Sequence, residues 1–137
     1  MAKNVQIHKA PETEKITINL GYVDLGRVEL LVKEGFYSNR TDFIRTAIRN
    51  QLSSHGQAVA QSIDRHTLEL GLRDFDRAEL GAAKAAREKL HIKVVGLVRI
   101  SPDVTPELAR ATIASVTVLG AFQASAAVKK ALADRLR

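Results

Sequence analysis

Apolar and polar residues alternate along a short stretch near the start of the chain, residues 15–20 (KITINL). Successive side chains of a β-strand point to opposite sides, so the alternation predicts a strand with one apolar and one polar face. Ile16, Ile18 and Leu20 would form the apolar face. The opposite face would carry a cation, a hydroxyl and a carboxamide, which can hydrogen-bond to base edges and phosphates: Lys15, Thr17 and Asn19.

The apolar pattern then changes to helical spacing in two successive segments. The first follows the turn residue Gly21 and stops near Gly35, because glycine tolerates the left-handed backbone that ends many helices. The second begins near Asn39 and Asp42, which resemble a capping box with Asp in place of the usual Glu or Gln. The stripe residues are Leu25, Val28, Leu31 and Val32 in the first segment, and Ile44, Ala47, Ile48 and Leu52 in the second.

This β-α-α segment is too small to bury a core alone, since chains near ~40 residues usually need oligomerisation or covalent staples. A lone strand also leaves its backbone N–H and C=O groups unpaired. Both problems vanish if two chains pair their strands antiparallel and interlock their helices. The resulting two-stranded ribbon fits a DNA major groove about 12 Å wide. The expected core of this dimer consists of Ile16, Ile18, Leu20, Val28, Ile44 and Ile48.

With KITINL and the following EGFYSNRTDFIRTAIR run, residues 15–52 resemble the ribbon-helix-helix DNA-binding proteins, the MetJ/Arc-like or CopG-like regulators. The GFYSNRTDFIR run is the more specific part. The resemblance implies that Lys15, Thr17 and Asn19 face the bases. It also implies that the start of the second helix holds a phosphate through free N–H groups and the positive end of its dipole. The phosphate contacts expected there are Ser38, Asn39 and Arg40, with Arg45 either joining them or serving only as a solvated cation.

The last seventy residues contain a regular spacing of glycines. Gly71, Gly96 and Gly120 lie in short β-like runs, 25 and 24 residues apart, and a helical stretch follows each run. This predicts three β–turn–α units, whose glycines form a degenerate repeat or recur by chance. Helices are expected over 77–90, capped by Asp76, and over 126–136, capped by Ser125, with a short one starting at Pro106.

Strands alternating with helices favour a small parallel sheet. The runs at residues 92–100 and 113–122 are nearly continuous in Val, Ile and Leu, which is typical of strands buried on both faces. The expected fold class is therefore α+β, an intertwined ribbon-helix-helix dimer followed by a small α/β domain. Its parts are a flexible arm (1–14), the DNA-binding domain (15–52), a helical connector with a bend or break near Gly56 (53–66), and an α/β domain for oligomerisation or effector binding (67–137).

Composition narrows the function without deciding it. The net charge of +6 suits nucleic acid, yet residues 1–66 hold nine Lys/Arg against seven Asp/Glu, so DNA affinity must come from a few well-placed groups. The absence of cysteine excludes disulfides and Cys-ligated metals, and the four histidines show no metal-ligand spacing. No known catalytic motif and no long apolar segment or signal peptide is present, so we expect no enzyme, no cofactor, no metal, no membrane association and a cytoplasmic location.

These patterns predict a homodimeric, sequence-specific transcriptional regulator, most simply a repressor, that binds double-stranded DNA. Its second domain would bind an unknown small-molecule effector, join dimers into a larger assembly or contact a protein partner. Two alternatives stay open. One is an antitoxin that masks a toxin and autoregulates its operon. The other belongs to a different class, a ligand-binding or assembly module whose ribbon serves only to dimerise it.

Overall fold

The computed structural model describes residues 12–137, which divide into two compact units. The N-terminal unit comprises residues 15–64, and the C-terminal unit comprises residues 65–137 together with residues 12–14. Of the flexible arm expected over residues 1–14, residues 1–11 lie outside the described part of the chain. None of the helices in the described part of the chain is long and apolar enough to cross a membrane.

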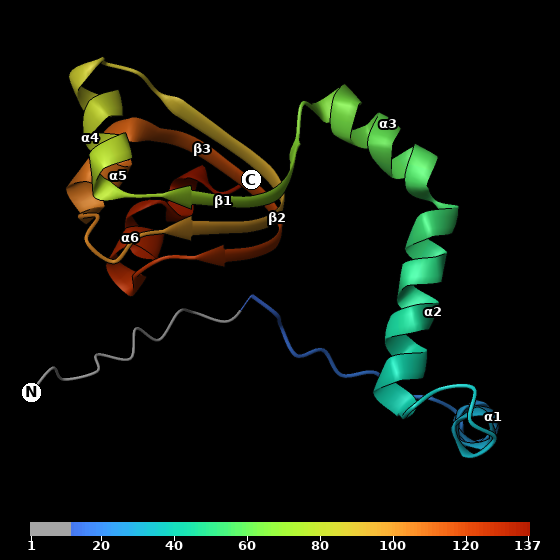
Figure 1. The fold of residues 1–137 in the computed structure, drawn as a ribbon. Helices are drawn as coiled ribbons and strands as arrows, with labels where there is room; N and C mark the ends of the chain where they lie inside the picture. Colours follow the sequence, from blue (N-terminus) through green and yellow to red (C-terminus); the bar gives the residue numbers. More distant parts are fainter. Residues whose placement is uncertain (1–11) are drawn as a thin grey trace, which may run out of the picture. The chain divides into compact units, whose positions relative to one another are not determined.

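The first helix of the N-terminal unit, α1 (Tyr22–Lys33), ends where its glycine predicted (Figure 1). Gly35 has a φ of +85°, in the left-handed region. The Gly35 N–H donates to the Val32 carbonyl at 3.1 Å, and the Phe36 N–H donates to the Leu31 carbonyl at 3.0 Å. These two bonds form a Schellman motif, which satisfies carbonyl groups that the helix end would otherwise leave free.

Two further helices follow, α2 (Arg40–Ser54) and α3 (Gly56–His66), and they meet at a bend. The break expected near Gly56 is confirmed, with His55 as the single residue between the helices. The Ser54 hydroxyl donates to the Gln51 carbonyl at 2.7 Å, a side-chain bond of the kind that bends helices.

Residues 15–20 form no strand within the single chain, so the ribbon expected from two chains stays a prediction. The segment runs as a non-helical stretch into α1 and pairs with no described strand (Figure 1). The physical reason is that a strand requires a partner backbone to satisfy its N–H and C=O groups. Its apolar side chains stay exposed, with Ile16 at 72%, Ile18 at 57% and Leu20 at 44%.

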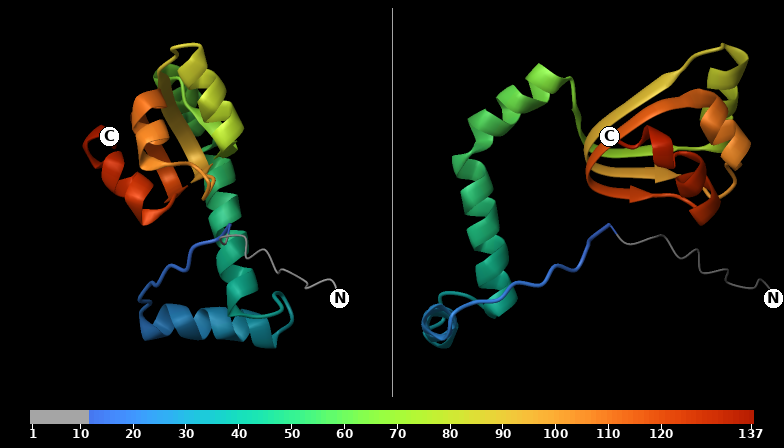
Figure 2. Two further views of the ribbon diagram at one scale, coloured as in Figure 1. Left: turned by 90° about the vertical axis from the view of Figure 1, so that its left-hand side faces the viewer. Right: turned by 180° about the vertical axis from the view of Figure 1, so that it is seen from behind.

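The C-terminal unit consists of three β–α units, as the glycine spacing predicted (Figure 2). Each helix begins at an expected residue: Asp76 Oδ1 accepts from the Glu79 N–H at 2.7 Å, and Ser125 Oγ accepts from the Val128 N–H at 3.2 Å. Pro106 occupies the first turn of its helix. The elements are β1 (Glu69–Phe75), α4 (Arg77–Ala85), β2 (Leu90–Ile100), α5 (Pro106–Thr112), β3 (Ile113–Gln123), α6 (Ala126–Ala131) and the 3₁₀ turn η1 (Ala133–Arg135).

The three strands form a parallel sheet in the order β1-β2-β3. Gly71 pairs with Gly96, and Gly96 pairs with Gly120, so the glycines stand side by side across the sheet. All three have φ between +125° and +141°, a conformation that residues with a Cβ rarely adopt. The spacing of 25 and 24 residues therefore reflects a structural repeat and not chance.

The glycines turn β2 and β3 back on themselves, so that both ends of each strand lie near the helices (Figures 1 and 2). The expectation of strands buried on both faces holds only in part, since the adjacent residues Leu97 and Val98 are both buried but His91 and Lys93 are exposed. Ile92, Val94, Val98 and Ile100 face the core, whereas other side chains of the same sheet face outward and stay exposed. A folded-back strand buries the inner side of both its halves, and this produces the same run of apolar residues. The exposed positions include Leu70, Leu72, His91, Lys93 and Leu119.

Two helices end earlier than the apolar pattern predicted. The helix expected over 77–90 stops at Ala85, because Arg87 adopts a left-handed φ of +56° and the Glu88 N–H caps the Ala83 carbonyl at 2.9 Å. The helix expected over 126–136 stops at Ala131 and continues as η1. The core that these elements enclose comprises Phe75, Leu80, Ile92, Val94, Val98, Ile100, Val104, Ala109, Ile113, Val116, Val128 and Leu132.

Candidate nucleic-acid interface

The polar residues of the 15–20 segment are all accessible. Lys15, Thr17 and Asn19 are exposed, and they alternate with the exposed apolar residues described above. A lysine offers donors only, whereas threonine and asparagine side chains can both donate and accept. This combination can contact phosphates and base edges, provided that a second backbone holds the segment extended.

The start of α2 is capped by its own side chains. Asn39 Oδ1 accepts from the Asp42 N–H at 2.8 Å, and Asp42 Oδ2 accepts from the Ser38 N–H at 3.0 Å. This reciprocal pair confirms the expected capping box, although the second bond goes to Ser38 and not to the cap residue itself. The backbone N–H groups of Arg40 and Thr41 have no acceptor within the helix, because they belong to its first turn.

The expected phosphate contacts differ in how free they are. The Ser38 N–H already has an acceptor in Asp42, and that carboxylate places a negative charge at the end of the helix that would attract a phosphate. Arg40 forms an exposed ion pair with Glu29 of α1. Arg45 is exposed and has no acidic partner within 4.0 Å among residues 12–137. Arg45 and the first amides of α2 are therefore the groups most open to a phosphate.

The residues predicted to form a dimer core do not form a core in one chain. Val28 is buried, and it is the only buried residue among residues 15–64. Ile44 is half-buried, and Ile48 is exposed along with the three apolar residues of the 15–20 segment. The edge-to-face contact of Tyr37 with Phe43, with centroids 5.0 Å apart, joins the turn before α2 to its first turn. This unit presents an apolar surface without a cover.

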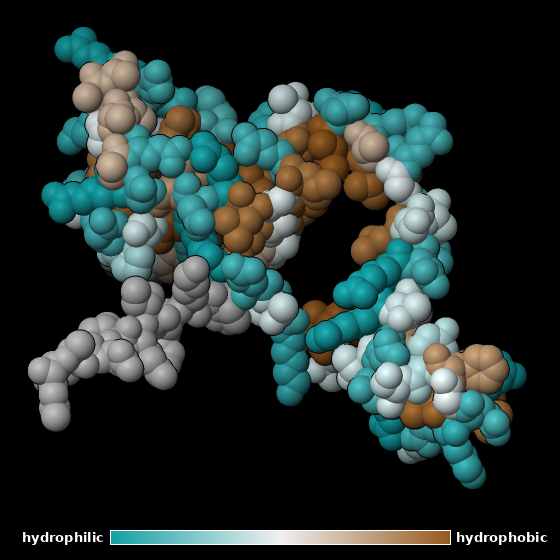
Figure 3. Space-filling view, viewed as in Figure 1, coloured by the Kyte–Doolittle hydropathy of each residue, from teal (hydrophilic) through white to brown (hydrophobic). Residues whose placement is uncertain are grey.

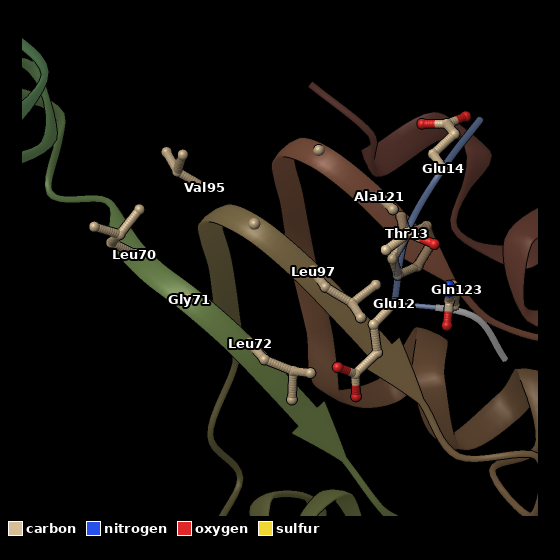
Figure 4. A pocket seen from close by; sticks show the side chains of 13 residues that line it. Glu12, Thr13, Glu14, Leu70, Gly71, Leu72, Val95, Leu97, Ala121 and Gln123 are labelled. Atoms are coloured by element: carbon tan, nitrogen blue, oxygen red, sulfur yellow. The ribbon is translucent and has the colours of Figure 1, made fainter. Parts of the chain in front are cut away.

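The C-terminal unit carries an open groove along its glycine row (Figure 4). Leu70, Leu72 and Leu97 lie along it with the backbone of the glycines, and Glu12 lies at its rim. The Glu12 carboxylate accepts from Arg99 Nη2 at 3.0 Å, an ion pair that ties residue 12 to β2. A mainly aliphatic lining suits an apolar side chain or ligand better than a charged one. Within the described residues no group of three or more His, Asp or Glu side chains could hold a metal ion.

Sequence patterns did not reveal three features of these sites: the groove, the Glu29–Arg40 ion pair and the bond from Ser38 to Asp42. The ion pair joins residues eleven positions apart on different helices, so it depends on how α1 packs against α2. The Ser38 bond had a local signal, because the backbone N–H of the residue before the cap is within reach of the acid at the end of a capping box. The groove also had a signal in the sequence, because the three glycines mark where the strands turn.

Comparison with known proteins gives one match, to a protein family. No curated protein and no solved structure matches the chain. The model of one protein family does match, and its match covers residues 11–129, so it includes most of the C-terminal unit as well as the helices of the N-terminal unit. The chain therefore belongs to the ribbon-helix-helix transcriptional regulator family.

Proposed function

We propose that the protein is a homodimeric, sequence-specific repressor that inserts a two-stranded antiparallel ribbon into the DNA major groove. DNA binding and dimerisation are general properties of the family. The repressor role, the ribbon geometry and the contact residues are the parts that we add. The expected site is a short palindrome, because a two-fold symmetric dimer presents the same surface to each half-site.

The observation that carries this proposal is the missing core of the N-terminal unit. Residues 15–64 bury only Val28, while the apolar side of the 15–20 segment lies open beside them. A second copy supplies what one chain lacks: a partner strand for the backbone and a cover for Ile16, Ile18 and Leu20. Pairing of the two segments turns their polar sides outward together, and a ribbon of this kind fits the major groove.

Base contacts come from Lys15, Thr17 and Asn19 of both chains. Asparagine can bind adenine through two hydrogen bonds, lysine can donate to guanine, and threonine can donate, accept or touch a thymine methyl. The start of α2 fixes the position on the backbone through the free amides of Arg40 and Thr41. Asn39 caps the start of the helix, and Arg45 adds a positive charge beside it. Arg40 can also contact the phosphate when the phosphate displaces Glu29 from its ion pair. Ser38 contributes through its hydroxyl, since its amide is engaged by Asp42.

The C-terminal unit is proposed to control the regulator, by joining dimers or by binding an effector. Its groove along Gly71, Gly96 and Gly120 is the surface available for either role. The unit has a complete core of its own, which argues against the poorly ordered tail that antitoxins often use to wrap a toxin. Co-purification of a small partner protein would instead favour the antitoxin.

Selection of bound sequences from a random DNA pool tests the base contacts. The variant carries Thr17→Ala and Asn19→Ala, and the matched control carries Asn50→Ala and Ser53→Ala, two exposed polar positions in the second half of α2. The wild-type protein and the control should select one palindromic site, whereas the variant should bind with relaxed base preference. Selection of the same site by the variant with undiminished discrimination would contradict the assignment.

The salt dependence of DNA binding separates a regulator from an assembly module. Each phosphate that the protein neutralises contributes about −0.9 to the slope of log K against log salt concentration. A dimer whose two Arg45 side chains and two α2 starts contact four phosphates should show a slope of roughly −3.6 or steeper. A slope near zero at low salt would favour a module whose ribbon serves only for dimerisation.

A further inference from the structure

The apolar side of the third helix is only partly covered in the single chain, where Ile63 is half-buried. No residue of α3 is buried, and α3 makes no extensive contact with another described helix or strand. Val59 is 40% exposed, and Leu52, just before the bend, is 60% exposed. An isolated helix of 11 residues is marginal in water, so α3 needs a surface to pack against.

This apolar side continues the stripe of α2 through the bend. Ile48, Leu52, Val59 and Ile63 are four, seven and four positions apart, which places them within a sector of about 60° on a helix with 100° per residue. The bend lies at His55, and the Val59 N–H donates to the His55 carbonyl at 3.0 Å in the first turn of α3. Apolar side chains are exposed at intervals along the α2–α3 segment, separated by hydrophilic ones (Figure 3). We call these four residues the apolar stripe.

We propose that the dimer interface extends beyond the three elements of the ribbon-helix-helix motif, and that the α3 part of the apolar stripe packs against the second copy of this chain. The proposal rests on the dimer of the proposed function and deepens it. Ile48 was expected in that dimer, and the same spacing of apolar residues recurs in α3 beyond the bend at His55. In a two-fold dimer the same side of both chains faces the partner, so a stripe that starts in the interface stays close to it.

The polar side of α3 supplies matched controls. Gln57 and Gln61 lie about 160° from Val59 around the helix, and both are exposed. An aspartate at 57 adds the same charge to the same helix as an aspartate at 59, but on the side that faces water. The two variants therefore add the same charge to opposite faces of the helix, and only Val59→Asp removes an apolar side chain.

The test is the dimer dissociation constant of the full chain, measured by sedimentation equilibrium. Val59→Asp should raise the constant at least about tenfold, since it buries a charge in the interface, and Gln57→Asp should leave it within about twofold of wild type. A dimeric wild type whose Val59→Asp variant behaves like Gln57→Asp would overturn the α3 contact alone. A wild type that stays monomeric at high concentration would contradict the proposed dimer itself.

If the Val59→Asp variant fails to fold, a second measurement on other variants tests the proposal. The chain has no cysteine, so Val59→Cys and Gln57→Cys each give a single thiol. The thiol at 59 should react slowly with a thiol reagent where the protein is dimeric and quickly after dilution to monomer, while the thiol at 57 reacts quickly throughout. Protection of the thiol at 59 that persists in the monomer would show that α3 packs on its own chain, and equal rapid reaction at both positions would show that it packs on nothing. Either result overturns the proposal.

Discussion

The positions at which the fold restricts the amino acid most tightly are the glycines of the parallel sheet. A Cβ at Gly96 would lie 2.0 Å from the Gly71 carbonyl oxygen, and a Cβ at Gly120 would lie 2.0 Å from the Gly96 carbonyl oxygen. These contacts involve backbone atoms of a neighbouring strand, which cannot move without breaking the sheet. The turn in β2 and β3 therefore depends on glycine for both space and backbone conformation.

Gly96→Ala should destabilise the protein by at least about 2 kcal/mol, because it adds a steric clash to a strained φ. Gly81→Ala is the matched control, since Gly81 lies inside α4 with an ordinary φ and nothing within 4 Å of its Cβ position. That change should be neutral or stabilise by up to about 1 kcal/mol. Urea unfolding followed by circular dichroism measures both values. Equal effects would mean that the turn does not depend on Gly96.

A second residue-scale effect concerns the end of the C-terminal unit. Arg110 donates to both oxygens of Asp134, at 2.8 and 3.2 Å, and this hydrogen bonding lowers the pKa of the Asp134 carboxyl below its ordinary value. A lowered carboxyl pKa adds stability above the unfolded pKa, about 3.9, and that stability disappears as the pH falls through the folded value. Asp134→Asn should remove this part of the acid sensitivity, seen as a smaller loss of unfolding free energy between pH 5 and the acid limit. An unchanged pH profile would mean that the Arg110–Asp134 ion pair is too solvated to affect the free energy of unfolding.

At the scale of elements, local signals predicted most of the chain. Asn39, Asp76 and Ser125 each cap a helix as expected, because a cap involves only residues within one turn. The sheet was harder, since an apolar run is compatible with burial on both faces and with a strand that folds back over its own core. The absence of a strand at 15–20 has a different cause, because this segment pairs with no described strand of its own chain.

The charge at the start of α2 should affect the affinity for DNA. The Asp42 carboxylate lies where the proposed phosphate approaches, so Asp42→Asn should strengthen DNA binding about threefold or more at low salt while its remaining oxygen can still accept from Ser38. Asp64→Asn removes the same charge from the exposed polar side of α3 and should change the affinity little. Fluorescence anisotropy with a labelled operator measures both. No difference between the two variants would argue against a phosphate at this helix start.

At the scale of the whole molecule, the two units differ in how they are stabilised. The C-terminal unit encloses a core of twelve buried residues, whereas residues 15–64 contain one buried residue. The C-terminal unit therefore has a core within one chain, whereas residues 15–64 have none. The small size of the segment predicts a dependence on a second chain, and the exposed Ile16, Ile18 and Leu52 are consistent with that prediction.

Tyrosine fluorescence can follow the N-terminal unit alone. Both tyrosines, Tyr22 and Tyr37, belong to residues 15–64, and the chain has no tryptophan. If this unit is stable only as a dimer, a hundredfold rise in protein concentration should increase its unfolding free energy by about 2.7 kcal/mol by mass action. The midpoint of urea unfolding detected by tyrosine should rise accordingly. A midpoint independent of concentration would mean that one chain stabilises the unit without a partner.

The pairing of residues 15–20 between two chains can be measured directly by NMR on a dimer that mixes isotope-labelled with unlabelled chains. We expect contacts from the amides of this segment in the labelled chain to the same segment in the unlabelled chain, together with slowed amide exchange. A sample shown to be dimeric that has no such contacts, and rapid exchange throughout residues 15–20, would contradict the ribbon and the mode of DNA binding that depends on it.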